Sequence, residues 1–316
     1  MTVNESFIAL QEHVDGDVAL AQLARERRDI FKDALRSSDD VESVWGSGSL
    51  RRSTQLQPIH DVDLVVEFDR TAHPDWGNAG ASASEALERC RDLVTERLGI
   101  DSGTHERLVR LVRTANRNRA AKCFVDPPED ELAFTVDVMP AIRVEGGILI
   151  PLKSEERWTL ADPEYLAHAV SDRQAAWDKF RPLVRVLKFW SKQQSVEIKS
   201  LVMEVLALDC LVEAANRPAA VASFFARAAQ HSLDVTDPAG LSGPIQPNLD
   251  VAGFRDALEE ASIWAAAAQR AVADNNQPEA TRLWAHIFGS AFPIVLPPTG
   301  ETPGPRPVKD SPQGRA

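Results

Sequence analysis

The feature that most constrains the fold is the stretch from Val44 to Phe68, in which two apolar runs are joined by a turn of small residues. The second run begins with two aspartates, Asp61 and Asp63, separated by one valine. Because side chains alternate across a strand, both carboxylates point to one face while the neighbouring apolar residues point to the other. Two carboxylates in one site repel each other, so the pattern predicts a cation held between them.

A turn rich in glycine and serine precedes the two aspartates and predicts a phosphate-binding element. Glycine lets the backbone approach a phosphate closely, and N–H groups at the start of a following helix favour negative charge. Two registers are open, because Gly46-Ser47 and Gly48-Ser49 both precede the aspartates at a distance. We favour Gly48 and Ser49, since residues 50–54 then form the short helical turn that carries a phosphate at its start.

These residues resemble a known signature. Gly48-Ser49, followed after eleven residues by Asp61-Val62-Asp63-Leu64, resembles the DNA polymerase β-like nucleotidyltransferase superfamily. Within it, Gly-Ser-Leu-Arg-Arg-Ser-Thr resembles the bacterial cGAS/DncV-like nucleotidyltransferases, anti-phage enzymes that make cyclic oligonucleotides; Ser53 stands where these commonly have glycine. A lone Asp-x-Asp pair is usually a solvated surface feature, but the turn before it and the apolar strand after it make the resemblance specific. The resemblance covers residues 44–293.

A third carboxylate lies in the β-rich segment from Leu132 to Ala141, where Asp137 is surrounded by apolar residues. A carboxylate in an otherwise buried strand is costly unless it is paired or bound to a metal, so Asp137 also requires a cation. The alternative is a surface aspartate on an edge strand. The resemblance implies that Asp137 stands on a strand beside the one that carries Asp61 and Asp63.

From Asp162 onward the sequence is helical, and the proline after Asp162 is a helix-start signal. A helix is expected over residues 181–194, and four cations share one of its faces: Arg181, Arg185, Lys188 and Lys192. Such a basic stripe is usually solvated. The resemblance implies that Lys188 and Ser200 reach across a cleft to the nucleotide triphosphate. Leu201 follows Ser200 where the family often has an aromatic residue, which counts against base stacking at this position.

The rest of the chain gives a coarse outline. Apolar spacing predicts a long helix over residues 4–36, broken near Gly16, a helix over 81–98 and a weak strand over 104–114. Further helices are expected over residues 199–215, 218–231, 251–273 and 278–288, with a loop over 234–248. Trp284 and Phe288 share one helix face and are expected to pack. The proline- and glycine-rich residues 297–316 predict a disordered tail.

Composition narrows the function classes. The net charge is −12, and a protein that grips a polynucleotide backbone normally presents a basic surface, so free nucleotides are favoured over DNA or tRNA. No apolar run is long enough to span a membrane, and the first fifteen residues lack the regions of a signal peptide. The three cysteines are Cys90, Cys123 and Cys210, and they show neither disulfide nor zinc spacing. This predicts a cytoplasmic protein.

The resemblance implies an α+β, two-lobed polymerase β-like fold, with a catalytic lobe at 1–160, a helical lobe at 161–293 and a tail at 294–316. Asp61, Asp63 and Asp137 would hold two Mg²⁺ ions, or Mn²⁺, while Gly48 and Ser49 bind the phosphates of ATP, GTP or another NTP. The expected product is a cyclic di- or trinucleotide second messenger for anti-phage defence. No membrane or nucleic-acid template is expected, and an activating partner protein is allowed for.

Two alternatives stay open. One is a nucleotidyltransferase that modifies tRNA, a protein or a small molecule such as an antibiotic. The other is a catalytically silent nucleotide-binding or partner-binding module, against which the three intact carboxylates argue.

Overall fold

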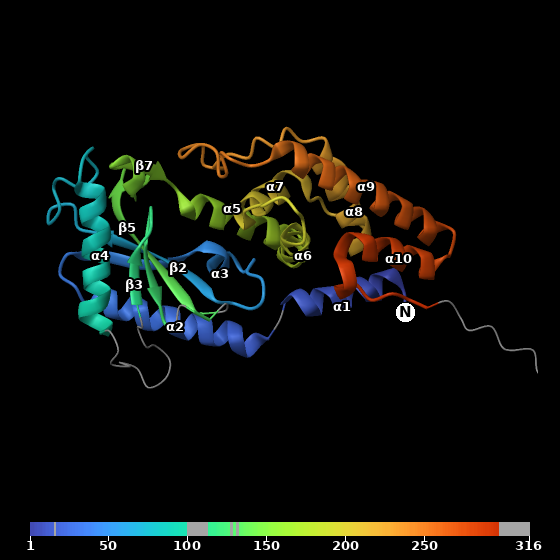
Figure 1. Ribbon diagram of the computed structural model, residues 1–316, viewed down its shortest axis with the longest axis horizontal. Coiled ribbons are helices and arrows are strands. Elements are labelled where there is room, and N and C mark those ends of the chain that lie inside the picture. Colours follow the sequence, from blue (N-terminus) through green and yellow to red (C-terminus); the bar gives the residue numbers. More distant parts are fainter. Residues whose placement is uncertain (16, 100–112, 127–128, 131–132, 297–316) are drawn as a thin grey trace, which may run out of the picture.

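The computed structural model describes residues 1–296 apart from residues 16, 100–112, 127–128 and 131–132. A mixed seven-stranded sheet with two helices forms one side of the molecule, and a helical region forms the other (Figure 1). The strands are β1 Val41–Ser47, β2 Asp61–Phe68, β3 Arg113–Asn116, β4 Ala121–Phe124, β5 Thr135–Val144, β6 Gly147–Leu152 and β7 Arg157–Ala161.

The sheet has the strand order β1-β2-β5-β4-β3, and β6 and β7 extend it from the second half of β5. Neighbouring strands are antiparallel except for β2 and β5, which run parallel at its centre. The parallel pairing matters for the site because it sets Asp63 directly opposite Asp137. Residues one strand apart at the same register lie close together, and their side chains share one face.

Helices α2 (Val18–Arg36) and α4 (Ser82–Leu98) cover one face of this sheet. The even-numbered residues of β2 point to them and join a buried cluster that includes Val62, Leu64 and Val66. The odd-numbered residues of β2 therefore point to the opposite face, which carries only a small apolar cluster around Val65. Burial of one face of the sheet leaves the carboxylates on the face that is free to form a site.

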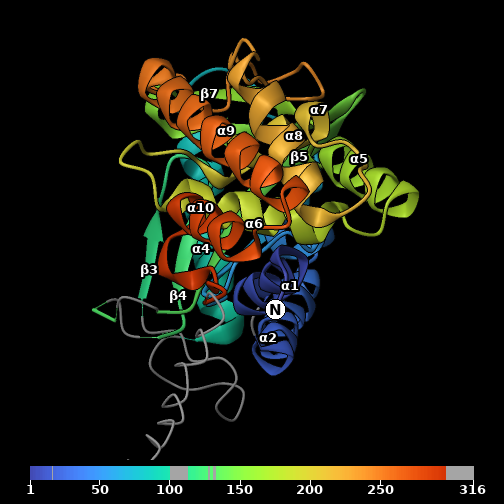
Figure 2. The ribbon, with the colours of Figure 1, turned by 90° about the vertical axis from the view of Figure 1, so that its right-hand side faces the viewer.

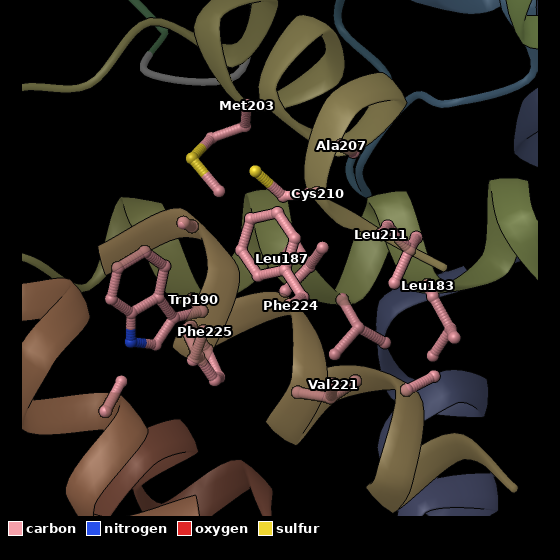
Figure 3. Packing of buried hydrophobic residues seen from close by; sticks show 14 of the residues in the cluster. Leu183, Leu187, Trp190, Met203, Ala207, Cys210, Leu211, Val221, Phe224 and Phe225 are labelled. Atoms are coloured by element: carbon pink, nitrogen blue, oxygen red, sulfur yellow. The ribbon is translucent and has the colours of Figure 1, made fainter. Parts of the chain in front are cut away.

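The helical region has its own core, which contains the largest buried cluster of the described residues. Its helices are α1 Val3–Asp15, α5 Pro163–Ala176, α6 Phe180–Lys192, α7 Ser200–Cys210, α8 Arg217–Ala229, α9 Val251–Ala273 and α10 Gln277–Phe288. Trp190 of α6 packs edge-on against Phe225 of α8 with ring centroids 5.0 Å apart (Figure 3). Figure 2 views the molecule from the side of the helical region, and there α9 and α10 lie in front of α6 and α8.

The N-terminal helical segment is divided in two, as the expected break near Gly16 predicts. Helix α1 ends at Asp15 and α2 begins at Val18, where the Asp17 carboxylate accepts a hydrogen bond from Ala19 N at 2.7 Å. The two helices pack on different cores. Phe7 of α1 contacts Trp284 in the helical region, whereas α2 packs on the sheet.

Other sequence expectations compare as follows. The helix-start signal is confirmed, because Asp162 caps α5 through Glu164 N and Tyr165 N, both at 3.1 Å. The helices expected over 81–98 and 251–273 are confirmed by α4 and α9. The expected strand at 104–114 overlaps β3 only at its end, since residues 104–112 lie outside the described residues, as does the tail at 297–316. None of the described helices has the length and apolar character needed to cross a membrane.

Candidate active site

Three carboxylates meet on the open face of the sheet. Asp61 and Asp63 come from the start of β2 and Asp137 from β5, and one carboxylate oxygen of each lies within 4.8 Å of the others. Thr135 Oγ1 donates a hydrogen bond to Asp61 Oδ1 at 3.0 Å and helps to orient it. Carboxylate oxygens are the ligands that Mg²⁺ and Mn²⁺ prefer, so this cluster could hold a metal.

The electrostatics of the cluster favour the binding of a cation. Burial, together with the charges of Asp61 and Asp137, raises the pKa of Asp63 to about 7. Burial and Asp61 also raise the pKa of Asp137 to about 6. Asp137 Oδ1 is buried without a hydrogen-bond partner among the described residues, and Lys122 Nζ is 3.9 Å away. A buried carboxylate oxygen without a partner is where a bound ion is expected.

The turn before β2 lies directly against the carboxylate cluster. Gly48 has a φ of +66°, and a Cβ atom added there would collide with Asp63 Oδ2. Glycine is therefore required twice, by the backbone conformation and by the space. Helix α3 (Gly48–Arg52) begins at this residue, which agrees with the register that we favoured from the sequence. In the other register, Gly46 lies within β1.

Helix α3 ends at Ser53, which adopts the left-handed conformation with a φ of +56°. This is the position where the resembled family commonly has glycine, and the backbone conformation explains why glycine suits it. Ser53 N donates to Leu50 O at 3.3 Å, and Thr54 N donates to Ser49 O at 3.0 Å. The chain thus closes the turn with hydrogen bonds although it lacks the glycine.

Lys188 of α6 is buried beside the end of α3, and its contact with a nucleotide triphosphate stays a prediction. Its side chain is 2% exposed, and Nζ donates to Thr54 O at 2.7 Å and to Glu204 at 3.0 Å. Burial lowers the pKa of Lys188, and the charge of Glu204 opposes this shift. The ammonium group therefore has two protein partners, one on the α3 turn and one on α7.

Ser200 is the first residue of α7, where it is half-buried. Glu204 follows it by one helical turn, so both residues lie on one face of α7. Sequence analysis missed Glu204 as a member of the site's surroundings. The signal was available, because a glutamate among the apolar residues 201–208 needs partners when it is buried.

Comparisons with known proteins give a sequence relative and several similar structures. No family model matches the chain. The cyclic AMP-AMP-AMP synthase of an Acinetobacter species is 24% identical over 326 residues, which cover 93% of this chain and 86% of that protein.

Solved structures show the fold. The Escherichia coli MS115-1 CdnC with ATP has a TM-score of 0.72 at 18% identity, covering 92% of this chain and 98% of that one. The same protein in a complex with HORMA-deltaN has a TM-score of 0.70 at 18% identity and the same coverage. The Vibrio cholerae di-nucleotide cyclase DncV has a TM-score of 0.57 at 13% identity, covering 93% and 89%. The predicted α+β polymerase β-like fold is confirmed.

Proposed function

We propose that this chain is a member of the bacterial cGAS/DncV-like nucleotidyltransferases, and that it joins NTPs into a cyclic di- or trinucleotide and releases pyrophosphate. We place the reaction in the cytoplasm and its product in anti-phage signalling. The observation that carries the proposal is the convergence of Asp61, Asp63 and Asp137 beside a glycine turn that touches Asp63. A metal-dependent transfer to a hydroxyl group needs this combination of acidic ligands and a phosphate-binding turn.

The three carboxylates have separate roles in this proposal. Asp61 and Asp63 would hold both metal ions, and Asp137 would be a ligand of the ion that activates the attacking hydroxyl. Two Mg²⁺ ions, or Mn²⁺ in their place, supply Lewis-acid chemistry that lowers the pKa of a hydroxyl and neutralises phosphate charge. Asp137 Oδ1 is buried without a hydrogen-bond partner among the described residues, and the pKa of Asp63 is raised, so both carboxyl groups support these assignments.

The phosphates of the donor NTP lie at the α3 turn. Gly48 and Ser49 approach them with backbone N–H groups, since no Cβ atom at residue 48 stands in the way. Ser200 stays a candidate for a contact from the helical region, because α7 begins there. For Lys188 we propose an indirect role instead, on the basis of its burial.

The bond changes are the same at every step. The 2′- or 3′-hydroxyl oxygen of one nucleotide forms a bond to the α-phosphorus of another, and the bond between the α- and β-phosphates breaks. Pyrophosphate leaves, and the hydroxyl proton passes to solvent. Ring closure follows when the linear intermediate, which keeps its 5′-triphosphate, binds again with donor and acceptor exchanged. One set of three carboxylates can therefore form every bond.

The test is to incubate the purified chain with Mg²⁺ and four NTPs, without primer, and to analyse the products by mass spectrometry after phosphatase treatment. We expect a phosphatase-resistant cyclic product from the wild type and none from the double variant Asp61→Asn, Asp63→Asn. Linear products only, or a dependence on added RNA, would refute the cyclase assignment. Unchanged yield from the double variant would refute the site.

An activating protein partner is part of the proposal. The E. coli CdnC forms a complex with HORMA-deltaN, which makes a protein activator a reasonable expectation for a chain of the same fold. Addition of a HORMA protein of the kind found in that complex, with NTP consumption as the readout, tests this expectation.

A further inference from the structure

The end of helix α3 is held by the helical region through a buried network. We call this network the interlobe clamp; it consists of Arg52, Ser53 and Thr54 from the turn and of Arg185, Lys188 and Glu204 from α6 and α7. Its two sides are far apart in the sequence, by 152 residues between Arg52 and Glu204. The network therefore joins the two cores of the molecule at one point.

Each of the three turn residues forms at least one hydrogen bond to the helical region. Arg52 donates through Nε and Nη2 to the two carboxylate oxygens of Glu204, at 2.7 and 3.2 Å. The Ser53 carbonyl accepts from Arg185 Nη1 at 2.7 Å. The Thr54 carbonyl accepts from Lys188 Nζ at 2.7 Å, and its hydroxyl donates to Glu204 at 2.7 Å.

The clamp is buried and charged. The side chains of Glu204, Lys188 and Arg52 are 1%, 2% and 8% exposed. Burial acts to raise the pKa of Glu204, but Arg52 and Lys188 outweigh it and lower the pKa to about 2. Well-packed apolar side chains often stabilise a protein as much as a buried ion network does. Stability alone therefore does not account for these charges, whereas their directional hydrogen bonds fix a geometry.

The clamp lies at one end of a rigid element whose other end touches the metal cluster. Helix α3 has five residues, with Gly48 against Asp63 at its start and Arg52 against Glu204 at its end. A helix of this length spans about 7 Å, so a shift at one end moves the other. Glu204 also shares a helix face with Ser200, which ties the start of α7 to the same point.

We propose that Glu204, Lys188 and Thr54 are positioning residues, which fix the phosphate-binding turn against the carboxylate cluster and against the start of α7. They act on the phosphate-binding turn through Gly48. The proposal rests on the proposed function for its catalytic consequence, because a displacement of about 1 Å in a reacting group can lower a rate about 100-fold. Its structural part, the fixed position of the turn, can be measured without any reaction.

The structural measurement is hydrogen–deuterium exchange of the Ser53 and Thr54 amides in the protein without metal and nucleotide. Lys188→Met removes one cation and leaves the Arg52–Glu204 pair balanced, so the fold should survive. We expect these two amides to exchange at least tenfold faster in this variant, with α4 and α9 unchanged. Lys192→Met is the matched control, because Lys192 is exposed on the same helix. Wild-type exchange in Lys188→Met would overturn the proposal.

The kinetic measurement uses two substitutions at Thr54, which is fully buried. Thr54→Val keeps the shape and removes the hydroxyl, whereas Thr54→Ser keeps the hydroxyl. We expect at least a tenfold loss of kcat in Thr54→Val with the KM for ATP within threefold of wild type, and recovery in Thr54→Ser. Equal kcat in wild type and Thr54→Val would overturn the proposal.

The two measurements separate the possible explanations. A raised KM for ATP in Lys188→Met, with unchanged amide exchange, would make Lys188 a direct phosphate ligand and overturn the positioning role. If the wild type forms no cyclic product, the proposed function fails while faster exchange in Lys188→Met still supports the clamp.

Discussion

Replacement of Asp63 by asparagine should stabilise the metal-free protein in a pH-dependent way. The pKa of Asp63 is about 7 in the folded chain against an ordinary value of 3.8. An acid whose pKa is raised by folding favours the folded state fully below the unfolded pKa, and this contribution is lost as the pH rises through the folded pKa. Above pH 7 the folded chain carries a charge that its surroundings disfavour.

The magnitude follows from the shift. Three pH units at about 1.4 kcal/mol each correspond to about 4 kcal/mol of unfavourable free energy in the wild type at pH 8. At pH 5, little more than one unit above the unfolded pKa, the corresponding cost is about 1–2 kcal/mol. Asparagine carries no such charge, so the advantage of Asp63→Asn over wild type should grow by about 2–3 kcal/mol between pH 5 and pH 8.

The assay is urea denaturation at both pH values in a chelator, followed by far-ultraviolet circular dichroism. Asp33→Asn, at an exposed position of α2, is the control for removal of one negative charge. Addition of Mg²⁺ or Mn²⁺ at pH 8 should stabilise the wild type more than Asp63→Asn, because the ion offsets the charge that the variant lacks. A stability difference between variant and wild type that is equal at the two pH values would refute the reasoning.

Two further predictions concern the turn and the N-terminal helix. Gly48→Ala should abolish metal-dependent turnover, because the added Cβ collides with a carboxylate of the cluster. Gly240 also has a positive φ but lies in open space, so Gly240→Ala should cost about 1 kcal/mol of stability and keep activity. Equal turnover of the two variants would contradict this prediction. Phe7→Ala should lower the free energy of unfolding by about 3–5 kcal/mol, because Phe7 is buried against Trp284. Ile8→Ala, at a 39% exposed position, should lower it by under about 1 kcal/mol. Equal losses of the two variants in thermal or urea unfolding would show that α1 does not pack as described.

The three members of the carboxylate cluster were predictable because each has a local sequence signal. Alternation along one strand places Asp61 and Asp63 on one face, and the cost of an unpaired carboxylate marks Asp137. The structure brings all three together. The short helix after the glycine-serine turn was also accessible, and the structure has it at Gly48–Arg52, whereas the role of Gly48 in phosphate binding stays a prediction.

The clamp was not predictable, because its partners come from distant parts of the chain. A stripe of cations on α6 has the same sequence pattern whether it faces solvent, a phosphate or a buried glutamate. Lys188 faces a buried glutamate, because Glu204 and the Thr54 carbonyl accept its hydrogen bonds at the boundary between the two cores. The apolar stripe of α1 has the same limit, since it shows which face is buried but not against which helices.

The packing of α1 has a consequence for how the chain folds during synthesis. Val3 N donates to the side chain of Gln277 at 2.8 Å, a contact between residues 274 apart in the sequence. At about 5–20 residues per second, α1 leaves the ribosome roughly 15–50 s before its partner α10 is made. The part of its apolar face that packs on α10, around Phe7, stays uncovered for that time, whereas α6 and α8 are available earlier. The sheet can form earlier from residues that are all in place, so closure of the helical core is expected to be the late and aggregation-sensitive event in biosynthesis.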